Sequence, residues 1–325
     1  MLLDGSDAGA IERAAQLLAA GELVAFPTET VYGLGARADD DAAVARIFEA
    51  QGRPDTHPLI VHVTDAAAAL RFSASLPAVA QRLMDTFWPG PLTVIVPRAE
   101  GVAAAAAGGQ PSIGLRCPSH PVARALLAAT QRLGVGGVAA PSANRFGRIS
   151  PTRPAHVHDE FGAALPVLDG GDCDLGIESA IVDCSRSRPA LLRPGVLTRS
   201  QIEAAAGEPL LDPDANAPRA PGTLAAHYAP NARLRLMPAG MLRTALDLLG
   251  AEPLKLAVYS RSVLPRSSAV RHRRMPSRPD EVAHELFSVL REFDAEGAQL
   301  IWVEEPPPDP EWEGVRDRLQ RAAAA

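Results

Sequence analysis

Residues 27–35 read PTETVYGLG and directly follow the apolar run LVAF at 23–26. A short apolar run bounded by turn residues is typical of a buried strand, so this stretch predicts a strand that leads into a polar, glycine-rich loop. Turns favour Asn, Asp and Ser with one Gly. Here Thr, Glu and Thr stand beside Val and Tyr, which suits side chains that point into a pocket. The nine residues alone favour a ligand-binding loop and an ordinary connection about equally.

The first 200 residues alternate the signals of helices and strands. Apolar residues recur at helical spacing over 11–20 and 40–50, and Gly21 and Gly52 then supply natural C-terminal stops. Further helices are expected at 76–87, 122–130 and 200–206, and strands at 58–63, 92–96, 112–116, 138–140, 167–169, 179–183 and 191–192. Several strands follow one another without a helix between them. The pattern therefore predicts an α/β fold with a twisted mixed sheet and flanking helices.

The chain changes character after residue 206. Residues 207–232 are rich in Gly, Pro, Ala, Asp and Asn and lack hydrophobic periodicity, which is typical of a linker. Beyond them the sequence predicts strands at 254–259 and 300–303 and helices at 279–293 and 313–322. We therefore expect a large catalytic domain over 1–206, a linker or lid over 207–232, and a small C-terminal β/α (Rossmann-like) domain over 233–325.

Composition restricts the classes of function. The net charge is −6, and the only strong basic run is 271–274 (RHRR), which is more typical of a solvated loop than of a nucleic-acid-binding face. The three cysteines form no CxxC pair, which argues against a disulfide scaffold or zinc site and favours a reducing, cytoplasmic location. The N-terminal residues do not resemble a signal peptide, and no apolar run approaches the ~20 residues of a membrane span.

Three arginines stand near strand ends and are candidate partners for anions: Arg53, Arg116 and Arg193. Arg116 alternates with Leu115 and shares one strand face with Ser112. An arginine that faces inward needs an anion to offset its desolvation, and a carboxylate or phosphate serves that purpose. Arg53 follows a helix end, so it is either a C-terminal cap or an anion ligand.

Other polar residues have both an ordinary and a functional interpretation. His62 lies inside a strand, where a histidine is more often a packed core residue than a ligand. Ser142 and Asn144 follow a short strand and can point into one cleft, although a turn can show the same pattern. Ser150 precedes a helical segment and could cap it. The sequence contains no Walker-type phosphate loop, HExxH pattern or kinase signature.

Taken together, these segments resemble the YrdC family, in particular its long two-domain threonylcarbamoyl-AMP synthases. The matching blocks, in the family's order over residues 10–232, are PTETVYGLGA at 27–36, GRPDTHPLIVHV at 52–63, WPGPLTVIV at 88–96, SIGLRCPSHP at 112–121, APSANRFGRISPT at 140–152, GIESAIVD at 176–183, LLRPGV at 191–196 and APGTLAAHYAP at 220–230. The C-terminal part is similar only in its length, its β/α pattern and its RLQRAA ending.

The resemblance implies a YrdC-like catalytic domain and a nucleotidyltransferase reaction. L-Threonine, bicarbonate and ATP would give L-threonylcarbamoyladenylate and pyrophosphate, with Mg²⁺ held through the ATP phosphates rather than by a protein metal site. A separate tRNA threonylcarbamoyltransferase would then use the product to modify the adenosine beside the anticodon. The reaction requires neither direct contact with nucleic acid nor a membrane.

The resemblance also implies which residues meet the substrates, by positioning rather than by covalent catalysis. ATP would be bound by Arg53, His57, Ser112, Ser142, Asn144, Ser150, Arg193 and Tyr228, with Tyr228 closing over the site from the HYAP motif. L-Threonine would be bound by Thr30, His62, Arg116, Ala140 through its backbone, and Ser179. The chain departs from the family's KxR…SxN signature at Gln51, where the family has a lysine. A lysine would supply charge to a triphosphate, whereas Gln51 supplies only hydrogen bonds.

Two alternatives to this synthase remain open at the level of sequence. The first is a paralogue that activates another amino acid or serves a carbamoylation pathway. The second is a YrdC-type RNA-binding module, but the acidic net charge and the scarcity of lysine argue against it.

Overall fold

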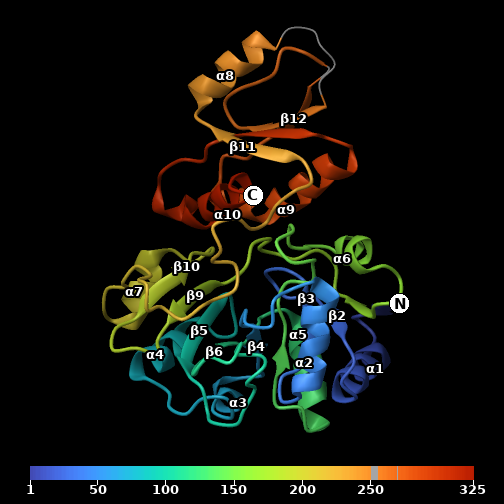
Figure 1. Cartoon of the computed structure of the whole chain (residues 1–325), viewed down its shortest axis with the longest axis vertical. Coiled ribbons are helices and arrows are strands. Elements are labelled where there is room, and N and C mark those ends of the chain that lie inside the picture. Colours follow the sequence, from blue (N-terminus) through green and yellow to red (C-terminus); the bar gives the residue numbers. More distant parts are fainter. Residues whose placement is uncertain (250–254, 269) are drawn as a thin grey trace. The chain divides into compact units, whose positions relative to one another are not determined.

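The computed structural model describes residues 1–249, 255–268 and 270–325, which form two compact units (Figure 1). The first unit comprises residues 1–146 and 150–223, and the second comprises 147–149 and 224–325. The expected linker at 207–232 is thus divided between the units.

The first unit is built on one mixed sheet of ten strands. The strands are β1 (Leu2–Asp4), β2 (Val24–Phe26), β3 (Gly33–Arg37), β4 (Ile60–His62), β5 (Leu92–Pro97), β6 (Ser112–Arg116), β7 (Val138–Ala139), β8 (Val167–Asp169), β9 (Ala180–Asp183) and β10 (Ala190–Arg193). Their order is β1-β8-β2-β3-β7-β4-β6-β5-β9-β10. Parallel pairs such as β4 with β6 and antiparallel pairs such as β5 with β6 occur side by side, so the predicted mixed sheet is confirmed.

Helices pack on both faces of this sheet. They are α1 (Ala8–Ala19), α2 (Asp41–Gln51), α3 (Ala66–Ala69), α4 (Ala78–Phe87), α5 (Pro121–Arg132), α6 (Pro154–Phe161) and α7 (Arg199–Ala206). Because side chains alternate along a strand, Phe26 of β2 packs with Leu18 of α1 and Leu126 of α5, whereas Ala25 packs in a second cluster with α2, α4 and α7. The two faces thus have separate apolar cores.

The face that carries α1 and α5 has a different cover over β4, β6, β5 and β9. Within the described part of the chain, Ile60, Ile95 and Ile181 pack there against Leu211, Ala217 and Ala220, from the irregular segment 207–223, and not against a helix. Ile113 and Leu115 face the opposite core. Ser112 and Arg116 therefore share the loop-covered part of the sheet with these isoleucines.

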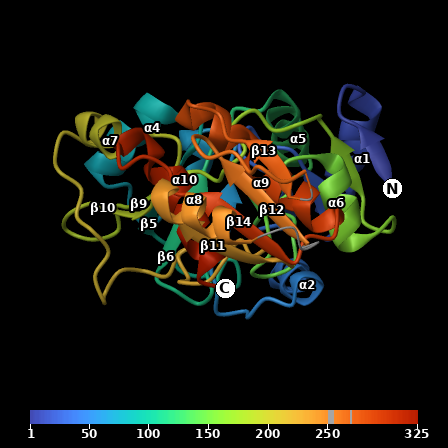
Figure 2. The ribbon, with the colours of Figure 1, turned by 90° about the horizontal axis from the view of Figure 1, so that it is seen from above.

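The second unit is a small parallel sheet with helices on both faces. Its elements are β11 (Arg233–Met237), α8 (Ala239–Leu248), β12 (Leu256–Ser260), β13 (Arg271–Arg274), α9 (Pro279–Ala295), β14 (Leu300–Glu304), the short helix η1 (Pro310–Trp312) and α10 (Glu313–Ala323). The strands are parallel in the order β11-β14-β12-β13, as their labels show in Figure 2. Figure 1 shows α8 on one face and α9 and α10 on the other, as expected for a β/α domain. Residue 254, the predicted first residue of β12, lies outside the described residues.

Three local predictions are wrong. The polar loop is shorter than 27–35, because β3 starts at Gly33 and pairs with β2; a Cβ at Gly35 would lie 2.9 Å from the Phe26 ring. Residues 271–274 form the edge strand β13 and not a loop, and Arg273 pairs with Glu285 at 2.9 Å. Ser150 caps no helix, since α6 starts at Pro154 with Arg153 at its N-cap.

Candidate active site

The loop at 27–32 is where distant segments of the first unit meet. Its backbone carbonyls accept hydrogen bonds from Leu175 and Gly176, at Glu29 and Thr30 respectively, and from Ala143 at Tyr32. Within the loop, Thr28 Oγ1 lies 2.9 Å from Thr30 Oγ1 and donates to the carbonyl of Val31 at 2.6 Å. These bonds hold the short polar side chains of the loop in one arrangement, as a binding surface requires.

Arg116 joins this loop to the sheet. Its Nη1 donates to Thr30 Oγ1 at 2.8 Å, its Nη2 donates to Glu29 Oε1 at 2.6 Å, and its Nε donates to the carbonyl of Gly90 at 3.4 Å. Both members of the ion pair are buried, with only 4% and 5% of their side chains exposed. The desolvation of Arg116 is thus offset within the protein by Glu29, a partner that strand alternation does not predict. Two of the five guanidinium N–H groups remain available for a ligand.

Glu29 stays ionised in this environment. Burial by itself would raise the pKa of Glu29, but the positive charge of Arg116 and hydrogen bonds from Arg116 and the backbone N–H of Ser119 hold the pKa below its ordinary value. The pair is therefore a fixed dipole whose positive end belongs to Arg116.

His62 lies beside Arg116, its register partner on the neighbouring strand β4. Burial, reinforced by the charge of Arg116, lowers the pKa of His62 to about 3, so the imidazole is neutral near pH 7. Its ring meets the Phe26 ring edge-on at 5.9 Å between centroids. Among the described residues Nδ1 of His62 has no hydrogen-bond partner, which leaves a buried polar atom for a ligand.

Ser179 and Arg193 come together on the same part of the sheet. Ser179 Oγ lies 2.8 Å from Thr93 Oγ1, and Arg193 Nη2 donates to Ser179 Oγ at 3.2 Å. Arg193 also donates to the carbonyl of Pro221 at 3.0 Å. Arg193 thus connects a predicted substrate residue to the segment that covers this face of the sheet.

Ser142, Asn144 and Ala140 lie in or beside a short segment after β7. Ala140 donates its backbone N–H to the carbonyl of Ile60 at 2.9 Å, and Ser142 forms an isolated antiparallel bridge with Gly33. Gln51 donates to the carbonyls of Ser142 and Asn144. The signature segment is therefore held between the 27–35 stretch and the end of α2.

Arg53 and His57 gather around the ring of Phe146. The Arg53 guanidinium carbon lies 5.5 Å from the ring centroid, and the His57 ring lies 5.2 Å from it. Burial and the nearby charges of Arg53 and Arg219 lower the pKa of His57. Gly52 caps α2 in the left-handed conformation, so Arg53 is not the helix cap that one interpretation expected.

Ser150 is fully buried and donates its hydroxyl to the carboxylate of Glu178. Ser112 lines a narrow cleft of about 10 Å³ together with Thr93, Gly114 and Arg219. It also lines a neighbouring cavity of about 460 Å³, together with Pro97 and Arg186. Both spaces lie on the loop-covered part of the sheet, where polar side chains replace a helix contact.

Tyr228 belongs to the second unit. It is buried there with the Phe287 ring at 5.4 Å and the Arg318 guanidinium carbon at 5.3 Å from its own ring. Its φ of 61° is unusual for a residue with a side chain. The contact of Tyr228 with ATP stays a prediction.

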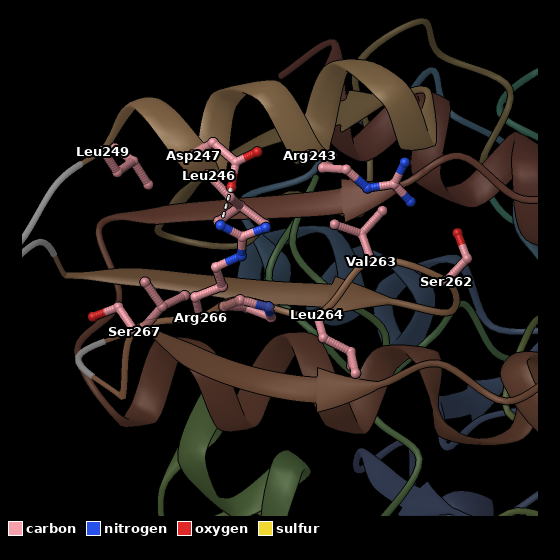
Figure 3. A pocket seen from close by; sticks show the side chains of 11 residues that line it. Arg243, Leu246, Asp247, Leu249, Ser262, Val263, Leu264, Arg266 and Ser267 are labelled. Carbon is pink, nitrogen blue, oxygen red and sulfur yellow. Dashed lines mark ion pairs between the residues drawn. The ribbon is translucent and has the colours of Figure 1, made fainter.

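The second unit also has a cavity of about 280 Å³ between α8 and the segment after β12. Figure 3 shows Arg243 and Asp247 on the helix side and Arg266 on the segment, with Arg266 Nη1 3.9 Å from Asp247 Oδ1. None of the predicted site residues is among the described residues that line it.

The structure joins four of the five residues predicted for L-threonine: Thr30 contacts Arg116, Arg116 is the register partner of His62, and Ala140 bonds to β4 through Ile60. Ser179, the fifth, contacts Thr93 and Arg193 instead. Sequence reasoning missed Glu29, Thr93 and Glu178 as buried polar partners. A carboxylate in the loop opposite an inward-facing arginine was a usable signal for Glu29. No comparable signal exists for the other two.

Two family models match the chain. The Sua5/YciO/YrdC model, described as telomere recombination, matches residues 16–195, and the model described as threonylcarbamoyl-AMP synthase, C-terminal domain, matches residues 197–324. Over these two ranges the structure has a mixed sheet with flanking helices, followed by a parallel β/α unit. The chain belongs to the Sua5/YciO/YrdC family, in its long form with the second domain.

Full-length relatives carry the same two parts. A protein named threonylcarbamoyl-AMP synthase from Pyrococcus abyssi is 36% identical over 325 residues, which cover 96% of this chain and 94% of the relative. One of the same name from Bacillus subtilis is 38% identical over 331 residues, covering 96% and 92%. The crystal structure of P. abyssi Sua5 with L-threonine has a TM-score of 0.89 and 34% identity, covering 98% of this chain and 95% of that one. The chain is accordingly an enzyme.

Neither a membrane span nor a metal cluster is present in the part of the chain that the structure describes. No described helix is both long and apolar enough to cross a membrane. No three His, Cys, Asp or Glu side chains among the described residues come together as metal ligands.

Proposed function

We propose that this chain is a threonylcarbamoyl-AMP synthase that acts as a nucleotidyltransferase. L-Threonine, bicarbonate and ATP would give L-threonylcarbamoyladenylate, pyrophosphate and water. Support comes from relatives of that name along nearly the whole chain and from the L-threonine complex of the P. abyssi protein. The observation that carries the proposal is the buried Arg116, bonded to Thr30, Glu29 and the carbonyl of Gly90 with two N–H groups remaining.

The amino-acid half of the site follows from this arrangement. The two remaining Arg116 donors are proposed to bind the carboxylate of L-threonine as a two-pronged pair. Thr30, Ser179, the neutral ring of His62 and the backbone of Ala140 would surround the rest of the substrate. Because the pKa of His62 is about 3, its ring adds no positive charge and can accept a hydrogen bond near pH 7.

The ATP half is proposed to use the remaining hydroxyls and arginines. Its residues are Arg53, His57, Ser112, Ser142, Asn144, Ser150 and Arg193, with Tyr228 from the second unit. Mg²⁺ bound through the ATP phosphates would neutralise charge on the departing pyrophosphate. The protein's own contribution is to hold the reactants in place and to stabilise charge.

Two bonds form in sequence. The neutral amine of L-threonine attacks bicarbonate, a C–N bond forms and water leaves, which gives the carbamate. A carbamate oxygen then attacks the α-phosphorus of ATP, the bond to the β-phosphate oxygen breaks, and pyrophosphate leaves. The product would pass to a separate tRNA threonylcarbamoyltransferase, so direct binding of nucleic acid or membrane is not required here.

The test is the release of pyrophosphate with bicarbonate, ATP and each of the twenty amino acids in turn. We expect release to depend on L-threonine and on bicarbonate. A higher kcat/KM with another amino acid would make the chain a paralogue with a different acceptor. If no amino acid supports release and tRNA is retained on filters with a steep dependence on salt, the RNA-binding alternative replaces the proposal.

A further inference from the structure

Gln51 is the position at which this chain departs from its family's signature. It is the last residue of α2 and is 4% exposed, so its side chain is directed into the first unit. A buried amide must find hydrogen-bond partners, because leaving its polar atoms without partners is costly. The hydrogen-bond partners of Gln51 therefore indicate the role of this position.

Both N–H groups of the Gln51 side-chain amide donate to one segment, residues 142–144. Nε2 donates to the carbonyl of Ser142 at 2.7 Å and to the carbonyl of Asn144 at 2.9 Å. The backbone carbonyl of Gln51 accepts from the N–H of Phe146 at 2.9 Å. One residue thus makes three hydrogen bonds along residues 142–146, more than 90 positions away in the chain.

The same segment is held on its other side by the 27–35 stretch. Ala143 donates its N–H to the carbonyl of Tyr32 at 2.8 Å, and Leu34 donates to the carbonyl of Pro141 at 2.8 Å. Gln51 donates to the carbonyls of Ser142 and Asn144 of this segment, and the Ser142 carbonyl also accepts from the N–H of Asn144 at 2.9 Å. Removing the amide donors would take away both side-chain hydrogen bonds that tie Gln51 to this segment.

We propose that Gln51 is a positioning residue that fixes the backbone of Ser142 and Asn144 for ATP. A lysine ammonium at position 51 carries donors and no acceptor, so it can make the same two bonds. Position 51 then contributes hydrogen-bond donors to the segment, and the charge of a lysine is dispensable. The Oε1 atom of Gln51 has no partner among the described residues, so the side chain bonds to the protein through its donors alone. This inference rests on the proposed function, because it concerns the residues assigned to ATP.

The experiment compares substitutions at position 51 that keep or remove donors. Gln51→Glu is nearly isosteric but acceptor-only when ionised, Gln51→Met removes all polar atoms, and Gln51→Lys keeps donors and adds a positive charge. Gln16→Glu, on the exposed side of α1, is the control for the same chemical change. Each variant is assayed for the Kd of ATP by calorimetry, for pyrophosphate release at varied ATP and varied L-threonine, and for thermal unfolding.

We expect Gln51→Glu and Gln51→Met to raise the KM for ATP at least tenfold and the KM for L-threonine less than threefold. Gln51→Lys should stay within threefold of wild type, and so should Gln16→Glu. Equal KM values for ATP in wild type and Gln51→Met overturn the inference, as does a Gln51→Lys variant that binds ATP far more tightly, since charge would then matter. If Gln51→Glu does not fold, Gln51→Met decides.

The two proposals fail in different ways. If wild type releases no pyrophosphate with L-threonine and bicarbonate, the proposed function fails, while the calorimetric comparison of ATP binding still tests Gln51. If wild type is active and Gln51→Met matches it in both assays, only the role of Gln51 is rejected.

Discussion

Two ends of one face of the ten-stranded sheet have opposite characters. Over β1, β8 and β2, helices α1 and α5 cover the sheet, and side chains such as Phe26, Leu18 and Leu126 form an apolar cluster. Over β4, β6, β5 and β9 the irregular segment 207–223 provides the cover, Thr93 lines a cleft with Pro221, and Arg116 bonds to the loop at 27–32. Both ends are buried, but only one is buried among polar groups.

The difference follows from what each cover supplies. A helix satisfies its own backbone and presents an apolar stripe, so the strands beneath it bury only apolar side chains. An irregular segment leaves carbonyls for side chains, as Pro221 does for Arg193. Polar residues can therefore be buried at that end, and a ligand can replace part of their hydrogen bonding.

The largest expected effect follows from breaking the ion pair at the polar end. Arg116→Met leaves Glu29 buried without its partner, which should cost about 3–5 kcal/mol of unfolding free energy. Pyrophosphate release should fall below detection. Urea unfolding and the release assay measure the two effects.

Arg116→Met combined with Glu29→Gln is the matched control for this change. The double variant should regain most of the stability, because no charge is left buried, yet it should remain inactive. Activity in either variant would remove Arg116 from the substrate site.

The next effect belongs to the helix-covered end. Leu126→Ala in α5 opens a cavity in the apolar cluster and should lower the free energy of unfolding by about 2–5 kcal/mol. Below its unfolding transition the variant should keep the kcat/KM of wild type, since no polar group changes. Leu133→Ala, at an exposed position, should change the unfolding free energy by less than about 0.5 kcal/mol. A loss of kcat/KM in folded Leu126→Ala would mean that the two ends are coupled.

The same substitution, threonine to valine, can be made at both ends of this sheet face and its effects compared. Thr93→Val removes the hydroxyl bonded to Ser179, and Thr130→Val removes a hydroxyl bonded to the carbonyl of Leu127 in α5. Each should cost about 1–2 kcal/mol in unfolding free energy. Only Thr93→Val should raise the KM for L-threonine, about three- to tenfold. Equal KM values in both variants would show that Thr93 has no positioning role.

The smallest effect is a pH dependence. His62 has its pKa lowered from 6.5 to about 3 by burial and by Arg116, so the unfolded chain binds a proton that the folded chain does not between these values. The unfolding free energy should therefore fall as pH drops below about 6.5, by about 1 kcal/mol for this group between pH 7.5 and 5.5.

His62→Gln should reduce that fall in stability, as measured by urea unfolding at the two pH values. His158→Gln, at an exposed position in α6, is the control for the same substitution. An identical pH dependence in His62→Gln and wild type would contradict the assignment of a neutral buried ring.

The elements with clear periodicity were predictable from the sequence. The bounds of β6 and β8 agree with the predicted strands, and α5 exceeds its prediction by one residue at the start and two at the end. Strand β13 was missed because four consecutive basic residues show no alternation. The limit of the 27–35 loop was missed because glycines signal turns, whereas Gly35 serves close packing against Phe26.

The sequence by itself determined the alternation of helices and strands, the inward orientation of Arg116 and the set of polar residues at strand ends, because side-chain periodicity is a local property of the chain. Only the tertiary structure decided which of those residues meet. Arg116 pairs with Glu29 across 87 positions, Thr93 meets Ser179 across 86, and Gln51 bonds Ser142 across 91. Such partners depend on strand order and on which segment covers the sheet, and neither is encoded in local spacing.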